Sequence, residues 1–471
     1  MSIRENIKTS VTFRLFIIGV LLVIFMIPTS MVNSLTHERE RNSHTVIDEI
    51  ASKWGRSQQI VGPILMVPYI HYQKTLEKDK KGNNSETITK VVQRAYFLPH
   101  KLNIDATVNP EVRYRNIYEA IVYKSDLKIN GTFKIEDFDK WGIKKEDILF
   151  NEARFLFSVS DSRGIKEQVK LSFNDEIKQF EAGTLNELTS LFRGGIQSDV
   201  KASWENSFSF DIKLNGSASI MFTPFGKTTD VKVSSSWKDP SFTGAFLPDN
   251  KDISDKGFSA SWRILDLNRG YPQSFLGDEI TMLSANRTFL NRVRPPYNSR
   301  MMPKPMPTAH NQTAFGVEFH MMVDYYQKSE RSIKYAMLFL SLTFLLFFFV
   351  EVFNKKKIHP FAYILVGFSL TLFFVLLLSF SEYIGFNYAY IVASIATIIS
   401  ITLYTKSLFK DSKFVKITLG LLVLLYAFMF TLLQLDEYAL LIGSVMLFIV
   451  LSVVMYISRD IDWYNISTSE S

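Results

Sequence analysis

Six long apolar runs dominate the hydropathy pattern of the chain. One lies near the N-terminus, and five follow one another towards the C-terminus. Each run approaches or reaches the roughly 20 residues that a helix needs to cross the hydrocarbon of a bilayer. The pattern therefore predicts six membrane-spanning helices, one N-terminal and five in a C-terminal bundle. The runs are residues 14–33, 335–353, 361–380, 387–405, 415–434 and 438–457.

The first run also has features of a secretory signal peptide. Its basic start contains Arg4, Lys8 and Arg14, and its apolar part ends at Pro28. The run is long for the apolar core of a signal, and no small-residue cleavage site of the A-x-A type follows it. We therefore favour an uncleaved anchor over a cleaved signal.

Lysine and arginine in short loops indicate how the spans are oriented, whereas long exported domains largely escape this rule. The short loops at residues 381–387 and 434–438 contain neither residue type. The loops on the other side are basic, so we expect both termini in the cytoplasm and residues 34–334 in the periplasm or outside. The basic residues are Lys355, Lys356, Lys357, Lys406, Lys410, Lys413 and Lys416, with Arg459 in the tail.

These spans divide the chain into four expected parts. Residues 1–33 form a cytoplasmic stub and the first helix, and residues 34–334 form the exported domain. Residues 335–457 form the five-helix bundle, and residues 458–471 form a cytoplasmic tail.

In the exported part the pattern changes to the period of two that is typical of β-strands. The clearest segment is SFSFDIKLNGSASIMF, residues 207–222, in which Asn215-Gly216 separates two alternating halves. Since Asn-Gly favours a type I′ turn, we expect a hairpin there. SDLKINGTFKI, residues 125–135, repeats much of this pattern, which indicates either a duplicated unit or the composition that hairpins favour.

Further strand-like runs are separated by turn signals, and two short helices are expected at residues 38–58 and 184–193. Many short strands of this kind predict a large, mainly β, sandwich-like domain. The additional strands are residues 91–98, 117–123, 153–160, 169–173 and 230–237.

The amino-acid composition agrees with this division into membrane and exported parts, and it excludes several classes of function. The 471 residues are 47% hydrophobic and include 40 Phe, which favours membrane content over an ordinary soluble protein. The formal charge of +7 is not gathered in a basic stripe, so we expect no nucleic-acid partner. With 0 Cys the chain has no disulfide, no thiol catalysis and no Cys-based metal site.

Motifs for chemistry are sparse. The chain has no nucleophile elbow, phosphate-binding loop or H-E-x-x-H, and the HERER segment at residues 37–41 fits no defined metal site. We therefore predict no catalytic residue, cofactor or metal, and read DSRG at residues 161–164 as a turn. The basic, proline-rich residues 292–312 suit either a segment that recognises an anionic partner or a surface loop, which we favour.

Ionisable residues at the ends of the apolar runs are the remaining candidates. Glu351 precedes Lys355 by one helical turn, which is the favourable order for an ion pair, and it lies within snorkelling reach of the interface. We expect it to anchor the membrane edge rather than to relay protons or ions. His359 falls at a helix start as a cap or interface residue, and Pro360 suits the first helical turn.

Glu382 directly follows the run at residues 361–380, so we expect it at the outer interface. Lys334 and Arg331 precede the second span on the same side. Our hypothesis is an ion pair between Lys334 and Glu382.

Six stretches between residues 53 and 464 together resemble the sequence of a known protein family. They are KWGRSQQIVGPILMVPY (53–69), SWKDPSFTGAFLP (236–248), GFSASW (257–262), RSIKYAMLFLSLTFLLFFFVE (331–351), HPFAYILVGFSLTLFFVLLLSFSEYIGF (359–386) and RDIDWY (459–464). In this order the chain resembles the CreD family of bacterial inner-membrane proteins, also described as cell envelope integrity proteins. The resemblance implies an N-terminal anchor, a periplasmic domain, a C-terminal bundle and a link to envelope stress, but no catalytic residues. The chain departs from the family by adding NISTSES (465–471).

Two hypotheses from different classes follow. The first is a non-enzymatic inner-membrane protein for envelope integrity or stress response, held in the lipid bilayer, whose exported β domain binds an envelope component or partner. The alternative is a transporter or lipid-handling protein that uses the C-terminal bundle. Ser394, Thr397 and Ser400 give that bundle a polar stripe, although such small residues commonly mediate helix packing. An envelope hydrolase ranks third because no group of residues supports it.

Overall fold

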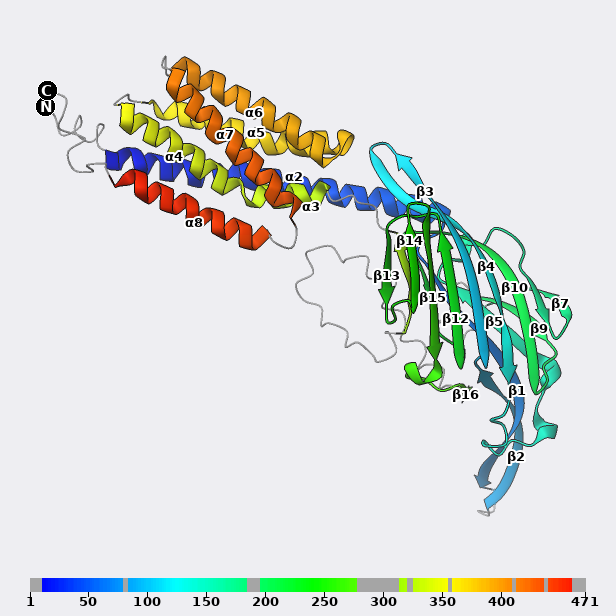
Figure 1. The fold of residues 1–471 in the computed structure, drawn as a ribbon. Coiled ribbons are helices and arrows are strands. Elements are labelled where there is room, and N and C mark those ends of the chain that lie inside the picture. The colour runs from blue at the N-terminus through cyan, green and yellow to red at the C-terminus, as the bar shows by residue number, and fades with distance from the viewer. Residues whose placement is uncertain are drawn as a thin grey trace, which may run out of the picture. The chain divides into compact units, whose positions relative to one another are not determined.

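A computed structural model describes most of the chain, and it divides into two compact units (Figure 1). Thr45–Met321 form what we call the β unit, whereas Met1–His44 and Met322–Ser471 form the helical unit. The residues described are 11–78, 84–183, 195–277, 313–319, 325–354, 358–408, 412–435 and 439–459.

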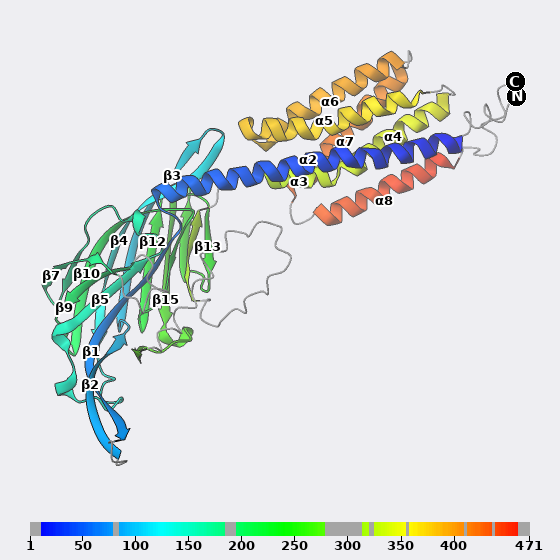
Figure 2. The ribbon, with the colours of Figure 1, turned by 180° about the vertical axis from the view of Figure 1, so that it is seen from behind.

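Two sheets build the β unit (Figures 1 and 2). The first has the order β13 (Pro240–Gly244), β17 (Phe315–Phe319), β11 (Ser219–Phe222), β1 (Gln58–Lys78), β5 (Ala153–Val159), β9 (Gly195–Val200) and β8 (Glu181–Ala182), with β2 (Asn84–Phe97) on β1 and β16 (Ser274–Leu276) on β2. The second has the order β14 (Asn250–Ser254), β15 (Gly257–Leu265), β12 (Thr228–Ser235), β3 (Lys101–Arg115), β4 (Tyr118–Lys134), β10 (Glu205–Ser217), β6 (Lys170–Phe173) and β7 (Glu176–Gln179).

The two sheets face each other across an aromatic core. The ring of Phe155 on β5 lies 5.3 Å from that of Phe208 and 5.9 Å from that of Phe210, both on β10 of the other sheet. Phe208, Phe210 and Leu214 are buried at the alternate positions that the sequence pattern indicated. The expectation of a large, β-rich domain is confirmed.

The predicted hairpin at Asn215-Gly216 is wrong. β10 continues through both residues, and the chain leaves the second sheet at Ala218, whose φ is +58°. β11 then pairs with β1 and β17 rather than with β10. Gly216 is needed for close packing, because a Cβ there would lie 2.3 Å from the ring of Tyr123. Gly131, in the second Asn-Gly pair, likewise lies inside β4, where a Cβ would strike the backbone of β3.

The other strands are found where the alternation predicted them, in β2, β4, β5, β6 and β12. The DSRG turn is also found, as a short 3-10 helix at Ser162–Gly164. The helix expected at residues 38–58 is the second part of α2, which starts at Val11, contains the whole first apolar run and ends at Trp54. The helix expected at residues 184–193 and the basic segment at residues 292–312 lie outside the described residues.

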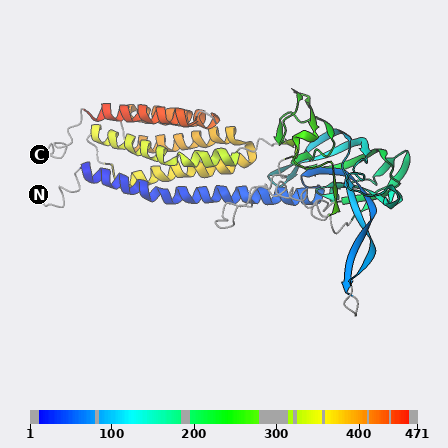
Figure 3. The same ribbon diagram turned by 90° about the horizontal axis from the view of Figure 1, so that it is seen from below.

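Beyond the sandwich, β1 and β2 continue as a two-stranded ribbon. Their antiparallel pairing runs from Leu65 opposite Phe97 to Lys78 opposite Asn84. Figure 3 shows this ribbon projecting from the rest of the β unit. We call the part from Ile70 to Lys78 and from Asn84 to Val92 the β1–β2 ribbon.

Long helices form the helical unit and lie side by side in Figure 1. Among the described residues, four helices are long and apolar enough to cross a membrane, or five when the bent pair α3 and α4 counts as one span. Helix α8 contributes a shorter apolar stretch, Leu441–Tyr456. The helices are α2 (Val11–Trp54), α3 (Tyr325–Lys334), α4 (Ala336–Asn354), α5 (Pro360–Ile384), α6 (Phe386–Leu408), α7 (Ser412–Gln434) and α8 (Ala439–Ser458).

Close aromatic packing joins α2 to the other helices of this unit. The ring of Phe25 lies 6.1 Å from that of Phe344 on α4 and 5.3 Å from that of Phe368 on α5. Gly367 allows this approach, because a Cβ there would lie 2.4 Å from the Phe25 ring. The first apolar helix is therefore packed into the bundle as well as preceding it in sequence.

Candidate functional site

Glu351 is the most deeply buried carboxylate of the helical unit among the described residues, with 2% of its surface exposed. Its Oε1 lies 2.9 Å from Nη1 of Arg14 and accepts a hydrogen bond of 3.1 Å from the backbone N–H of Ile358. Its Oε2 accepts a hydrogen bond of 3.0 Å from the hydroxyl of Tyr363. Both oxygens therefore have donors, as a buried carboxylate requires.

Local sequence explains this arrangement. Helix α4 ends at Asn354 and α5 begins at Pro360, and both Ile358 and the first turn of α5 contact Glu351 near the end of α4. Arg14 belongs to the start of α2. The group of Arg14, Glu351 and Tyr363, which we call the α2–α4–α5 joint, ties three helices together at one end of the bundle.

The expected pair of Glu351 with Lys355 stays a prediction. Glu351 is buried, and Arg14 is its ionic partner in the described part of the chain, whereas the expected partner Lys355 lies outside that part. A sequence signal was available, because the predicted topology put Arg14 and Glu351 on the same side of the membrane. A carboxylate held by three donors is suited to fixing helices rather than to moving protons.

His359 and Pro360 lie where the sequence places a helix start. His359 is the N-cap of α5, and its Nδ1 accepts a hydrogen bond of 3.2 Å from the backbone N–H of Phe361. Pro360 is the first residue of the helix, where its lack of an N–H costs no hydrogen bond.

At the opposite end of α5 the side chains do not form the pair that we expected. Lys334 Nζ lies 2.9 Å from Oε1 of Glu330, one turn earlier in α3. Glu382 instead accepts a hydrogen bond of 3.1 Å from the hydroxyl of Tyr326, which is buried. The i,i+4 spacing within α3 favours the local partner over the more distant one.

Among the described residues of the helical unit, some buried hydroxyls donate to the backbone of their own helix and others have no hydrogen-bond partner. Thr371, Thr397 and Thr405 donate to the carbonyl four residues earlier, as such residues commonly do in apolar helices. The polar stripe expected on α6 is divided, because Ser394 and Thr397 are buried but Ser400 is exposed. The hydroxyls without partners belong to Ser329, Ser332, Thr343, Ser394, Thr402 and Tyr426.

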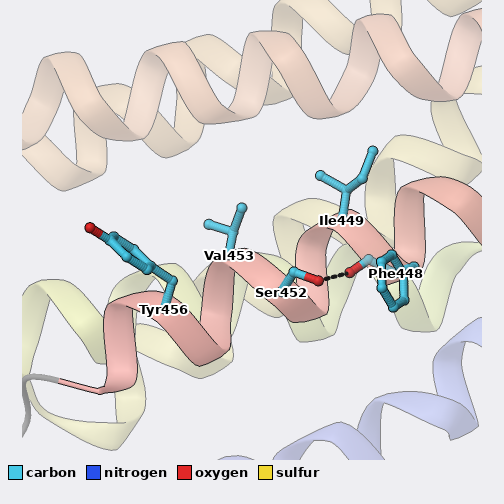
Figure 4. Close-up of a pocket in the computed structure, with 5 residues that line it drawn as sticks. All are labelled: Phe448, Ile449, Ser452, Val453 and Tyr456. Carbon is cyan, nitrogen blue, oxygen red and sulfur yellow. Dashed lines mark hydrogen bonds between the residues drawn. The ribbon is translucent and has the colours of Figure 1, made fainter.

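A hollow on α8 is lined by residues of that helix alone (Figure 4). Phe448, Val453 and Tyr456 are half or more exposed, and the hydroxyl of Ser452 donates to the Phe448 carbonyl. Among the described residues no polar group from another element lines this hollow, so the surface suits contact with apolar material rather than a specific small ligand.

In the β unit, Asp161 is buried but fully partnered. It accepts hydrogen bonds from Nε and Nη2 of Arg163, at 2.8 and 2.7 Å, and from the backbone N–H of Arg56 at 3.1 Å. Burial opposes ionisation, but these donors outweigh it and hold the pKa of Asp161 below its usual range. Asp161 therefore stabilises the turn after β5.

Among the described residues, no group of three or more His, Asp or Glu side chains is placed to hold a metal ion. His37 and Glu40 of the HERER segment approach each other at 3.6 Å on one face of α2. This contact is the ordinary i,i+3 neighbour geometry of a helix.

Comparison with known proteins gives matches over nearly the whole chain. The family described as "Inner membrane protein CreD" matches residues 10–464. The protein named "Inner membrane protein CreD" of Escherichia coli (strain K12) is 29% identical over 452 residues, which cover 94% of this chain and 92% of that protein.

Proposed function

Because the chain belongs to the CreD family of inner membrane proteins, we propose that it is a non-enzymatic protein of cell envelope integrity whose β unit binds an envelope component. The observation that carries this proposal is the β1–β2 ribbon. On β2, Ile88 and Val92 are 58% and 60% exposed and lie four residues apart on the same face. Exposed apolar side chains on a projecting ribbon favour a partner that covers them.

The proposed topology has six spans, with α8 as the sixth, both termini in the cytoplasm and the β unit in the periplasm. The lysine bias of the short loops supports it. The contact between Arg14 and Glu351 also supports it, since it brings the start of α2 and the end of α4 to the same end of the bundle.

Site-specific photocrosslinking tests the binding function. A photoreactive residue at Val92 in cells should capture one defined envelope component, whereas the same probe at Ile177 should not. Ile177 is a matched control because it is 75% exposed in the same unit but lies on β7 of the second sheet.

The variant I88S/V92S should lose the envelope phenotype at normal protein levels, while I177S keeps it. Equal capture at both positions, or an intact phenotype in I88S/V92S, would show that the ribbon is not the binding surface.

A transporter or lipid-handling function is the second candidate, and a specific observation favours it. Three of the hydroxyls without partners, those of Ser329, Ser332 and Thr343, belong to α3 and α4, which meet at a bend of 44°. Discontinuous helices build binding sites in transporters. Lipid and efflux profiling of S332A/T343A tests it. An accumulated substrate on one side of the membrane would favour transport, and an unchanged profile would favour the binding function.

A further inference from the structure

A short irregular segment after β15 holds an arginine in an unusual setting. The backbone N–H of Arg269 donates to the carbonyl of Asp266 at 3.2 Å, and the hydroxyl of Tyr271 donates to the carbonyl of Pro224 at 2.9 Å. The side chain of Gln273 donates to the carbonyls of Leu98 and Pro99, which follow β2 directly, at 2.9 and 2.6 Å. The segment is therefore fixed on both sides of Arg269.

Arg269 is buried, with 7% of its surface exposed. Its Cζ lies 4.4 Å from the centre of the Tyr271 ring, and its Nη2 donates to Oε1 of Gln273. Its Nε and Nη1 are shielded from solvent and have no hydrogen-bond partner. In the described part of the chain Arg269 forms no ion pair, and the carboxylate of Asp266, three residues earlier, supports its charge only at longer range.

This guanidinium is costly to the free protein. A buried charge without a counterion loses its hydration and gains little in return. Burial lowers the pKa of Arg269 from its usual value, but an arginine stays charged at any physiological pH. The positive charge therefore remains inside the β unit and calls for an anion.

Thr313 adds a second polar group of the same kind. It is 6% exposed, and its hydroxyl also lacks a partner. Burial raises the pKa of Tyr271 to about 12, while the neighbouring Arg269 and Thr313 oppose that rise. Arg269 stacks on the Tyr271 ring, and Thr313 lies close enough to the Tyr271 hydroxyl to influence its ionisation.

We propose that Arg269, Tyr271 and Thr313 form a receptor, the Arg269 site, for the carboxylate or phosphate group of an envelope component. Nη2 carries two protons and Gln273 uses one, so the other completes a two-donor fork with Nε or with Nη1. Such a fork matches the paired oxygens of a carboxylate or a phosphate. The Thr313 hydroxyl supplies a further donor, and the Tyr271 ring holds the guanidinium plane.

An ordered water is a simpler occupant of the Arg269 site, and the two occupants lead to different expected binding results. Water would satisfy an N–H group but would leave the charge without a counterion. Only an anion makes occupancy depend on both the charge and the planar shape of Arg269. The site is also independent of the β1–β2 ribbon, so either proposal can fail alone.

Isothermal titration of the full-length protein in maltoside detergent tests the site with two probes. Inorganic phosphate represents the phosphate source, and diacetyl-Lys-D-Ala-D-Ala represents a peptide carboxylate. We expect saturable binding of one probe, and the preferred probe tells a phosphate source from a peptide one. R269Q should weaken binding at least about tenfold, and R269K by about tenfold because lysine keeps the charge but loses the fork. T313A should weaken it about threefold.

R263Q is the matched control. Arg263 lies on the neighbouring β15, but it is exposed and its Nε lies 2.6 Å from Asp230. Its loss should leave binding unchanged. Near-ultraviolet circular dichroism establishes that each variant is folded, and R269K keeps the test valid if R269Q is not. Absence of saturable binding, or equal losses in R263Q and R269K, would overturn the proposal.

Discussion

Glu351 in the helical unit and Arg269 in the β unit are both buried charges, with 2% and 7% of their surfaces exposed. Glu351 receives donors on both oxygens, from Arg14, Tyr363 and a backbone N–H. Arg269 keeps two nitrogens without an acceptor. Burying an unpaired charge costs free energy, and a paired charge recovers part of that cost. Glu351 therefore suits a role in fixing helices, whereas Arg269 suits a role in binding an anion.

The largest effect should follow from breaking the α2–α4–α5 joint. E351A leaves Arg14 without its counterion, so the free energy of unfolding should fall by about 3 kcal/mol, the lower end for buried pairs, because Arg14 keeps some exposure. Thermal unfolding in detergent and accumulation in the membrane measure this loss. The exchange R14E/E351R should recover part of it. Wild-type stability of E351A would show that the joint does not hold the helices.

Two tyrosines repeat the comparison with neutral groups. The hydroxyl of Tyr363 donates to Glu351, whereas that of Tyr426 is buried without a partner. Y363F should therefore lower the free energy of unfolding by about 1.5 to 3 kcal/mol, and Y426F should change it by less than about 0.5 kcal/mol. Parallel thermal unfolding of the two variants measures the difference. Equal losses would mean that the Tyr426 hydroxyl has a partner after all.

Removing the unpaired charge should have the opposite sign. In buffer without phosphate or carboxylates, R269M should raise the free energy of unfolding by about 1 to 2 kcal/mol, after allowance for the lost contacts to Tyr271 and Gln273. R163M is the control, because Arg163 forms a two-pronged pair with the buried Asp161 and its loss should destabilise. A destabilised R269M would place Arg269 among the structural arginines.

Sequence patterns predicted the large elements well. Apolar runs and period-two alternation depend on local repetition, so the helices, most strands and the start of α5 at Pro360 could be read directly. Asn215-Gly216 misled because the glycine is required by the Tyr123 ring on another strand, which no local pattern encodes. Arg269 gave no signal at all, because burial without a partner is a property of the folded chain.

The partners of Glu351 and Lys334 also show that local sequence spacing does not determine which side chains pair. Spacing of i,i+4 suggested Lys355 for Glu351, but it applies equally to Glu330 and Lys334, which the structure joins at 2.9 Å. The contact of Glu351 with Arg14 joins positions far apart in the sequence. Predicting it required the topology of the whole bundle rather than the residues around Glu351.

The smallest effect should come from this exposed pair at the other end of the bundle. Lys334 is 65% exposed and Glu330 is 29% exposed, so solvent screens their attraction and K334A should cost at most about 0.5 kcal/mol. The same unfolding measurement on K334A and E351A then separates an exposed ion pair from a buried one. Because Glu382 bonds Tyr326 instead, the double reversal K334E/E382K should recover nothing that K334E or E382K loses. Recovery of membrane accumulation in the double variant would mean that Lys334 and Glu382 do pair in the membrane, and the local pair in α3 would then be secondary.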